Sequence, residues 1–164
     1  GWVDVHPLHG ADELPNNAQA SMILADYGYQ IQLLPLIPAS ETEKKKWLPD
    51  VFGSKNPDVR INGKLIGDIK TPDIRNPIRK SIISRCIYDA AKQKVPIAII
   101  NLLNRDYSFQ DVKKGIVGAL QPDRNKSILF VWIITHHGNL FVVDRQQVFN
   151  DMIYEELIRL FLPP

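Results

Sequence analysis

Apolar residues recur along the chain with two different spacings, which separate the expected helices from the expected strands. Helical spacing runs through residues 14–25, 77–92, 108–120 and 146–161. Alternating or short apolar runs of strand length occupy residues 29–34, 57–61, 64–70, 95–102, 127–135 and 140–143. Residues 1–12 follow neither spacing and residues 38–56 form a long polar connection, so we expect irregular backbone in both. Helices and strands in this order predict an α/β fold, a mixed β-sheet flanked by helices.

The strongest turn signal is Asn62-Gly63, which lies between two alternating segments and predicts a β-hairpin. A two-residue loop would pair Ile61 with Lys64. A three-residue loop, with Gly63 in a left-handed bulge, would instead pair Arg60 with Lys64. We predict the three-residue loop and a positive φ at Gly63.

The apolar pattern of the hairpin supports this choice of loop. Only the three-residue loop puts four of its apolar side chains together on one face, namely Val59, Ile61, Leu65 and Ile69. Asp58 is then expected opposite Ile66 and diagonal to Asp68, on one face with Lys70. A two-residue loop would turn Asp68 and Lys70 away from Asp58, so the candidate site depends on the bulge.

Asp58 is followed after nine residues by Asp68-Ile69-Lys70, and these residue types suit phosphodiester hydrolysis. Such hydrolysis needs a divalent metal that neutralises charge on phosphorus and lowers the pKa of the attacking water. Hard cations prefer carboxylate oxygens, which Asp58 and Asp68 would supply. Lys70, two residues further along the strand, would point to the same face and could orient the water or stabilise negative charge. The alternative is that these carboxylates are ordinary surface decoration of a hairpin.

Composition narrows the class of protein without fixing a function. With 164 residues, 45% of them hydrophobic, the chain is suited to a single globular domain, residues 1–164. No apolar run approaches the roughly 20 residues of a membrane-spanning helix, so no span is expected. The single cysteine, Cys86, excludes an internal disulfide and a cysteine-based zinc site. Because the chain begins with Gly1 rather than Met, we expect the C-terminal piece of a longer protein.

Basic residues gather in one stretch although the net charge is only +2. Residues 75–94 hold one acid, Asp89, and the basic residues Arg75, Arg79, Lys80, Arg85, Lys92 and Lys94. A polyanionic partner would suit such a face, and a solvated helix face is the alternative. Because Arg75, Arg79 and Lys80 directly follow the predicted strand 64–70, we expect them to hold phosphates beside the reacting bond.

The polar connection contains a second candidate surface for nucleic acid. Three lysines, residues 44–46, directly precede Trp47. Lys45 could contact phosphate while Trp47 stacks on a base. The alternative is a solvated loop with an anchoring tryptophan.

Histidines provide weaker candidates. His136 and His137 lie at a predicted turn, and adjacent strand residues point in opposite directions, so both cannot serve one site. His6 and His9 precede the first predicted helix and could approach a substrate.

Three segments together resemble a known superfamily. NPDVRINGKLIGDIKTP (56–72), with ADYGYQIQLLP (25–35) and KQKVPIAIINL (92–102), resembles the PD-(D/E)xK nuclease-like domains at the C-termini of contact-dependent growth-inhibition toxins. It is also similar to related domains in phage head-morphogenesis proteins. The resemblance covers roughly residues 9–145.

The resemblance implies a restriction-endonuclease-like fold and a metal-dependent endonuclease that hydrolyses phosphodiester bonds. It implies one or two Mg²⁺ or Mn²⁺ ions held by Asp58, Asp68 and the Ile69 carbonyl. Glu13 occupies the place of the glutamate that such families contribute from the first helix, with Asp12 as a nearby substitute. The alternative for Glu13 is an acid at a helix start that complements the helix dipole.

The resemblance also implies partners and a setting. RNA, in particular tRNA, is favoured over DNA as the substrate, and a toxin of this kind would have an immunity protein. Such a toxin would be delivered from a secreted or cell-surface parent protein and would act in the cytoplasm of the target cell. The alternatives are a DNA endonuclease of the same fold, a non-catalytic nucleic-acid-binding module, or a structural domain of a phage particle.

Overall fold

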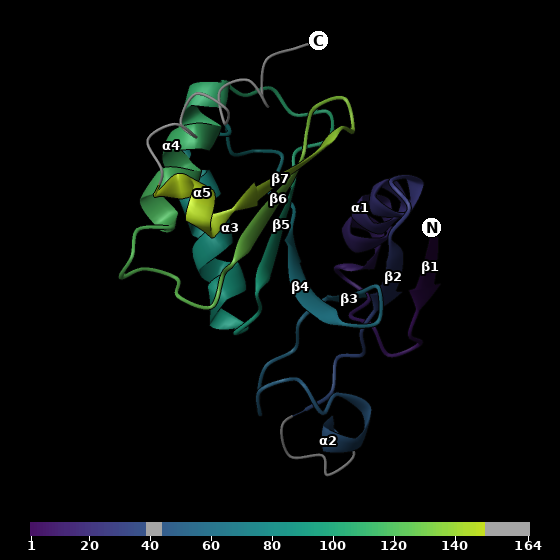
Figure 1. The fold of residues 1–164 in the computed structure, drawn as a ribbon. Helices are drawn as coiled ribbons and strands as arrows, with labels where there is room; N and C mark the ends of the chain where they lie inside the picture. Colours follow the sequence, from purple (N-terminus) through teal and green to yellow (C-terminus); the bar gives the residue numbers. More distant parts are fainter. Residues whose placement is uncertain (39–43, 150–164) are drawn as a thin grey trace.

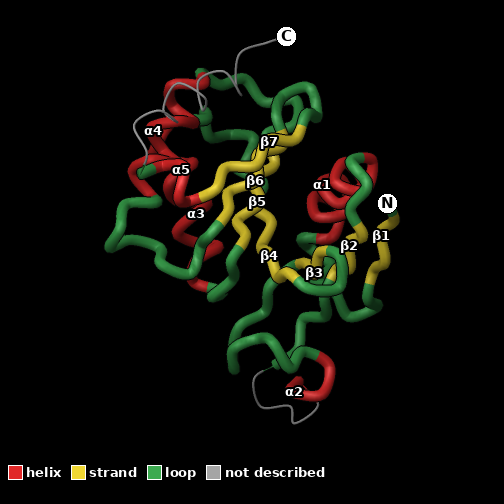
Figure 2. The backbone as a smooth tube through the Cα atoms, in the orientation of Figure 1, coloured by secondary structure: helices red, strands yellow, loops and turns green. Residues whose placement is uncertain are grey.

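The computed structural model describes residues 1–38 and 44–149 and places them in a seven-stranded sheet with helices on both faces (Figures 1 and 2). The helices are α1 (Leu14–Asp26), α2 (Lys44–Trp47), α3 (Lys80–Lys92), α4 (Phe109–Ala119) and α5 (Arg145–Val148). The strands are β1 (Trp2–Val5), β2 (Gln30–Leu33), β3 (Val59–Ile61), β4 (Leu65–Lys70), β5 (Ile97–Asn101), β6 (Phe130–Ile134) and β7 (Leu140–Asp144). The predicted α/β fold, a mixed sheet flanked by helices, is confirmed.

The strands lie in the sheet in the order in which they occur in the chain. β1 and β2 are parallel and joined through α1, and β4, β5 and β6 are parallel and joined through α3 and α4. The pairs β2–β3, β3–β4 and β6–β7 are antiparallel. In Figure 1, α3 and α4 cover one face of the sheet and α1 covers the other.

Each face of the sheet has its own apolar core. One core joins α3 and α4 to the sheet, and the other joins α1 to the opposite face. β5 lies between them with all five residues buried, which explains why its sequence is apolar without alternation. No helix among residues 1–38 and 44–149 is long and apolar enough to cross a membrane.

Most elements lie where the hydrophobic pattern predicts them, with two omissions. Residues 2–5 form β1, which was not predicted because a short edge strand with three of its four residues exposed has little apolar signal. Its partner, β2, lies more than twenty residues further along the chain. The connection 38–56 contains the four-residue helix α2, also not predicted. Of the helix predicted over 146–161, the structure shows α5, which ends at Val148 with Phe149 as its C-cap, and residues 150–161 lie outside the described residues.

The predicted start of the helix over residues 77–92, which is α3 in the structure, is wrong by three residues. α3 begins at Lys80, and Pro77 lies in the loop before it rather than in its first turn. The Arg105 guanidinium holds this loop by donating to the carbonyl oxygens of Pro72 and Asn76, at 2.7 and 2.6 Å. The Asn76 carbonyl is therefore used by a distant side chain instead of by a helical N–H.

The hairpin has a three-residue loop, but its register differs from the predicted one by two residues. Ile61 pairs with Leu65, so the loop is Asn62-Gly63-Lys64, with Lys64 N–H donating to the Ile61 carbonyl at 3.0 Å. The predicted positive φ at Gly63 is confirmed at 69°, and Asn62 is also left-handed at 49°. With two left-handed residues, the loop comprises residues 62–64 in place of the predicted 61–63.

This register keeps the predicted division of the hairpin into two faces. Arg60 pairs with Ile66, not with Lys64, and continuation of the ladder sets Asp58 opposite Asp68 rather than opposite Ile66. Directly opposite residues share a face, so the two carboxylates come together more closely than predicted. On the other face Val59, Ile61 and Ile69 enter the α1-side core, whereas Leu65 is 44% exposed.

Helices α3 and α4 approach so closely that a glycine at their contact has no room for a side chain. A Cβ on Gly115 would lie 2.5 Å from Ile83 Cβ and 2.8 Å from the Lys80 carbonyl oxygen. Gly115→Ala should therefore lower the free energy of unfolding by about 1–3 kcal/mol, measured by chemical denaturation. Gly118→Ala in the same helix is the control, because nothing lies within 4 Å of its Cβ. It should be neutral or stabilising by up to about 1 kcal/mol, and equal losses in both variants would contradict this packing.

Candidate functional site

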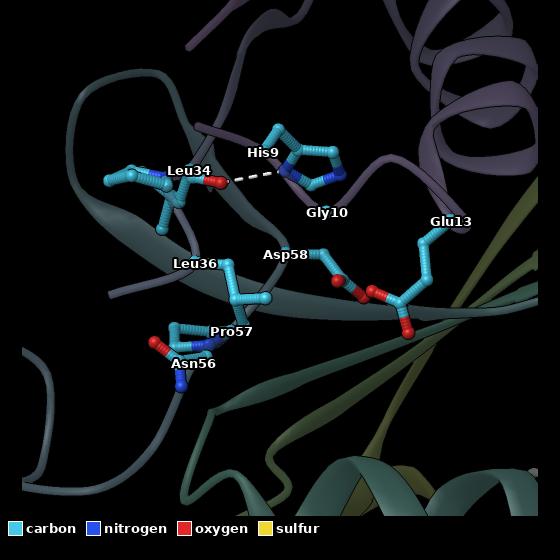
Figure 3. A pocket seen from close by; sticks show the side chains of 9 residues that line it. His9, Gly10, Glu13, Leu34, Leu36, Asn56, Pro57 and Asp58 are labelled. Carbon is cyan, nitrogen blue, oxygen red and sulfur yellow. Dashed lines mark hydrogen bonds between the residues drawn. The ribbon is translucent and has the colours of Figure 1, made fainter. Parts of the chain in front are cut away.

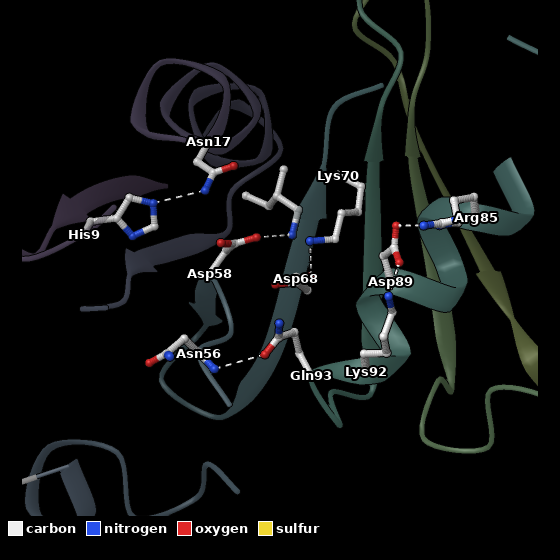
Figure 4. Close-up of polar contacts among 11 residues, drawn as sticks. His9, Asn17, Asn56, Asp58, Asp68, Lys70, Arg85, Asp89, Lys92 and Gln93 are labelled. Carbon is white, nitrogen blue, oxygen red and sulfur yellow. Dashed lines mark hydrogen bonds and ion pairs between the residues drawn. The ribbon is translucent and has the colours of Figure 1, made fainter. Parts of the chain in front are cut away.

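The candidate site lies where β3 and β4 separate. Their ladder ends at Val59 and Gly67, so Asp58 and the last three residues of β4 lie beyond it. Asp58 remains attached to the sheet on its other side, because its carbonyl accepts the Leu34 N–H at 2.8 Å. The opening between the strands is therefore lined by Asp58 on one side and by residues 68–70 on the other (Figure 4).

Side chains occupy the positions that backbone groups would fill in a continuous ladder. Asp58 Oδ2 accepts the Ile69 N–H at 2.7 Å. The N–H and C=O of a strand residue point to the same side, so the Ile69 carbonyl is also directed toward this opening. Lys70 Nζ lies 2.6 Å from Asp68 Oδ2. The predicted grouping of Asp58, Asp68 and Lys70 is thus present in the structure.

Burial shifts the pKa values of the ionisable groups in this cluster. Asp58 is 5% exposed and Asp68 is 1% exposed. Burial, followed by the charge and hydrogen bond of Asp68, raises the pKa of Asp58 to about 7. Burial also raises the pKa of Asp68, although the Lys70 ammonium opposes the shift. Burial alone would lower the pKa of Lys70, but the surrounding carboxylates, Asp68 first, raise it.

Glu13 joins the same group from the residue preceding α1. Its carboxylate faces that of Asp58 in Figure 3 and makes no capping hydrogen bond to its own helix. Partial burial and the Asp58 charge raise the pKa of Glu13. Three carboxylates therefore surround one ammonium, that of Lys70, although Glu13 is the exposed member of the set. Asp12, the substitute considered from the sequence, is also exposed.

His9 fixes the segment that leads to Glu13. The His9 ring is buried, with Nδ1 2.6 Å from the Leu34 carbonyl oxygen and Nε2 3.0 Å from Asn17 Nδ2. A carbonyl only accepts, so Nδ1 carries the proton and Nε2 accepts from the Asn17 amide. Both ring nitrogens are used, and His9 acts as a strut between β2 and α1 rather than as a group that approaches substrate.

Asn56 fixes the segment that leads to Asp58, a role that the sequence pattern did not reveal. Asn56 N–H donates to Gln93 Oε1 at the end of α3, at 3.0 Å. Its Oδ1 accepts from Ile37 N–H at 3.1 Å and from Lys44 Nζ at 3.2 Å. Three segments distant in sequence therefore meet two residues before Asp58.

A divalent cation suits the donors present. Among residues 1–38 and 44–149 no group of three or more His, Cys, Asp and Glu side chains has the arrangement of a metal site. Mg²⁺, however, is commonly held by one or two carboxylates, with water and substrate phosphate completing its shell. Asp58, Asp68 and the Ile69 carbonyl offer that number of protein oxygens, and Glu13 lies beside them. The excess of negative charge here is what a cation would neutralise.

The residues predicted to contact nucleic acid are exposed but lie on two separate surfaces. Arg75, Arg79 and Lys80 occupy the loop before α3 and its first residue, and Arg75 is paired with Asp73. Lys45 and Trp47 lie on α2, which projects away from α3 and α4 in Figure 1.

Within α2 the three lysines differ in environment. Lys44 is buried and donates to the Ile37 carbonyl at 3.2 Å, so it anchors the helix instead of facing solvent. Trp47 remains 55% exposed, with the His6 ring edge-on to it at 6.0 Å. Lys45 and Trp47 therefore remain available on this surface.

Comparison with protein families gives this site its context. The family model described as the contact-dependent growth inhibition CdiA C-terminal domain matches residues 55–140, just over half of the chain. The chain belongs to this family. It is thus a CdiA C-terminal domain, a toxin domain of bacterial competition, and the matched residues include Asp58, Asp68 and Lys70 but not Glu13.

A solved structure supports the fold of this CdiA C-terminal domain. The chain is similar to one in the CdiA-CT/CdiI toxin and immunity complex from Burkholderia pseudomallei, at 21% identity and a TM-score of 0.57. The similarity covers 88% of this chain and 99% of that chain. At this identity it supports the α/β fold alone. No curated protein matches the sequence.

The raised pKa of Asp58 predicts how the stability of the CdiA C-terminal domain depends on pH. The folded domain holds the Asp58 proton up to about pH 7, whereas the unfolded chain releases it near its ordinary value of 3.8. This stabilising contribution is complete below pH 4 and is lost as the pH rises toward 7. Asp58→Asn imitates the protonated form and can still accept the Ile69 N–H. In chelator, its melting temperature should exceed that of the wild type by about 4 °C or more at pH 7.5, and by little at pH 4. A difference that does not change with pH would contradict this charge balance.

Proposed function

We propose that this CdiA C-terminal domain is a metal-dependent endonuclease of the PD-(D/E)xK type. The observation that carries the proposal is the pair of buried aspartates facing one lysine in the opening between β3 and β4. Burying two carboxylates beside a single ammonium costs free energy unless a cation or a proton compensates the remaining negative charge. In a toxin domain, such a cation could activate a water molecule to hydrolyse a phosphodiester bond.

Asp58, Asp68 and the Ile69 carbonyl would hold Mg²⁺ or Mn²⁺, with Glu13 at the rim. When bound, the metal supplies charge neutralisation at phosphorus and a water of lowered pKa. Lys70 directs its ammonium into the same opening, where it can orient the attacking water or donate to a phosphate oxygen. Its contact with Asp68 keeps it protonated, so it serves as a positive charge and donor. Asn56 and His9 hold the segments on either side of Asp58 in place.

The proposed substrate is RNA, in particular tRNA, with a DNA endonuclease as the second possibility. The proposed setting is delivery from a cell-surface parent protein into a target cell, where the domain acts in the cytoplasm. An immunity protein is the proposed partner. Support comes from the family and from the similar chain, which belongs to a toxin and immunity complex.

Two substitutions test the proposed catalytic roles. Asp68→Asn keeps the size of the side chain but removes a metal ligand, and Lys70→Met keeps its length but removes the charge. Each should reduce cleavage of tRNA, ribosomal RNA or plasmid DNA in Mg²⁺ by at least about 100-fold. Rates are measured with the substrate in excess, and circular dichroism verifies that each variant is folded.

Asp26→Asn is the matched control, because it removes an exposed carboxylate from the end of α1. It should cleave like the wild type. Full cleavage by both site variants would refute the site. Nucleic-acid binding that chelation leaves unchanged, without cleavage, would indicate a binding module in place of a nuclease.

Metal binding can also be followed without any reaction. Mg²⁺ or Mn²⁺ should raise the melting temperature at pH 7.5, by an amount equivalent to about 2.7 kcal/mol at 100 times the dissociation constant. The shift should disappear in chelator and in Asp68→Asn, and it should persist in Asp26→Asn. An equal shift in all three proteins would mean that the metal binds elsewhere.

A further inference from the structure

A second basic surface lies beside the candidate site, formed by α3 and the loop that precedes β6. Two adjoining hollows, of about 290 and 380 Å³, share Tyr88 and Asn125 in their linings. Their basic residues are Lys92, Lys94, Arg124 and Lys126, and all four are exposed. We call this surface the Tyr88 groove. Neither the sequence pattern nor the proposed mechanism uses it as a unit.

The groove combines an exposed aromatic ring with positive charge. Tyr88 is 51% exposed, and Lys92 Nζ lies 4.7 Å from the centre of its ring. Asp89 on the same helix is already paired with Lys92 at 2.6 Å and with Arg85 at 3.2 Å, and Asp123 is an exposed acid next to Arg124 in the loop. An aromatic ring surrounded by such cations suits a base that stacks while phosphates on either side meet lysine and arginine.

The loop that forms one wall of the groove, residues 121–128, is held in place by the Arg145 side chain. Arg145 is 9% exposed, and its guanidinium donates to four carbonyl oxygens of residues 121–128. The acceptors are Asn125 at 2.8 Å, Ile128 at 3.0 Å, Gln121 at 2.7 Å and Arg124 at 2.6 Å. Four bonds from one buried cation fix the backbone that presents Arg124 and Lys126. A preformed wall reduces the ordering cost of binding.

The groove is connected to the candidate site through the end of α3. Lys92 and Lys94 flank Gln93, whose Oε1 accepts the Asn56 N–H. Asn56 precedes Asp58 by two residues. The groove and the strand segment that carries Asp58 are therefore both attached to the end of α3.

We infer that the Tyr88 groove binds the sugar-phosphate backbone of the substrate outside the reacting bond, with an unpaired base stacked on Tyr88. The inference rests on the proposed nuclease function for the meaning of the bound strand. It extends that function by naming a class of substrate, a nucleic acid with an unpaired segment next to the cleaved bond.

Binding can be tested separately from cleavage by using Asp68→Asn as the background in every protein. The probes are a fluorescein-labelled 20-nucleotide single-stranded RNA and a blunt RNA duplex of equal length, followed by fluorescence anisotropy at several salt concentrations. Adding Tyr88→Ala should weaken single-strand binding between about 5-fold and 100-fold and affect the duplex less. Tyr88→Phe should retain the affinity, because stacking needs the ring and not the hydroxyl.

Charge reversal tests the phosphate contacts. Lys126→Glu should weaken binding of both probes and reduce the slope of log affinity against log salt by about 0.7 for the single strand. Lys64→Glu is the matched control, an exposed lysine in the β3–β4 loop, and should leave the slope unchanged. Melting temperatures verify that each variant is folded.

Equal affinities in Tyr88→Ala, Lys126→Glu and their controls would overturn the groove, as would absence of binding to either probe. Binding that depends on Tyr88 in a domain that cleaves nothing would keep the groove and remove the nuclease. Cleavage by the wild type with no effect of the groove variants on binding would do the reverse.

Discussion

Asp58 and Asp68 are buried beside the partly exposed Lys70 where β3 and β4 part, and the chemistry of the site depends on this imbalance of charge. One ammonium cannot compensate Asp58 and Asp68 together, and Glu13 adds a third carboxylate at the rim. Burial and the neighbouring Asp68 raise the pKa of Asp58 to about 7, so that a proton on Asp58 compensates part of the excess below that pH. A divalent cation would resolve it in another way, by displacing that proton. The excess of negative charge that opposes folding thus favours the binding of a metal ion.

The geometry of the opening is maintained by contacts between segments distant in the sequence. Asn56 joins the strand segment before Asp58 to the end of α3, and the His9 ring joins β2 to α1. Arg105 and Arg145 have the same kind of role in two loops, where each guanidinium holds backbone carbonyls that no secondary structure satisfies. In these four places polar side chains that are buried or half-buried supply hydrogen bonds where the sheet and helices are interrupted.

The sequence was sufficient for the fold class and for the grouping of Asp58, Asp68 and Lys70 on one face of the hairpin, because both depend on local periodicity. The alternation across the hairpin correctly separated Asp58, Asp68 and Lys70 from Val59, Ile61 and Ile69. The register was wrong by two residues, because it depends on backbone angles at both Asn62 and Gly63 and the pattern specified only the glycine. Strand β1 and the start of α3 depend on partners far along the chain, β2 and Arg105, which periodicity does not contain. The positioning contacts of His9, Asn17 and Asn56 could not be predicted for the same reason.

If the cluster around Asp58 hydrolyses phosphodiester bonds with a divalent metal, as we propose, nucleic-acid cleavage must depend on that metal. The most direct measurement incubates the purified domain with tRNA, ribosomal RNA and plasmid DNA in Mg²⁺, in chelator, and in chelator followed by excess Mg²⁺. We expect cleavage of at least one nucleic acid in Mg²⁺, none in chelator, and recovery when the metal is restored. Cleavage that continues in chelator, or no cleavage of any of the three substrates with Mg²⁺ or Mn²⁺, would contradict it.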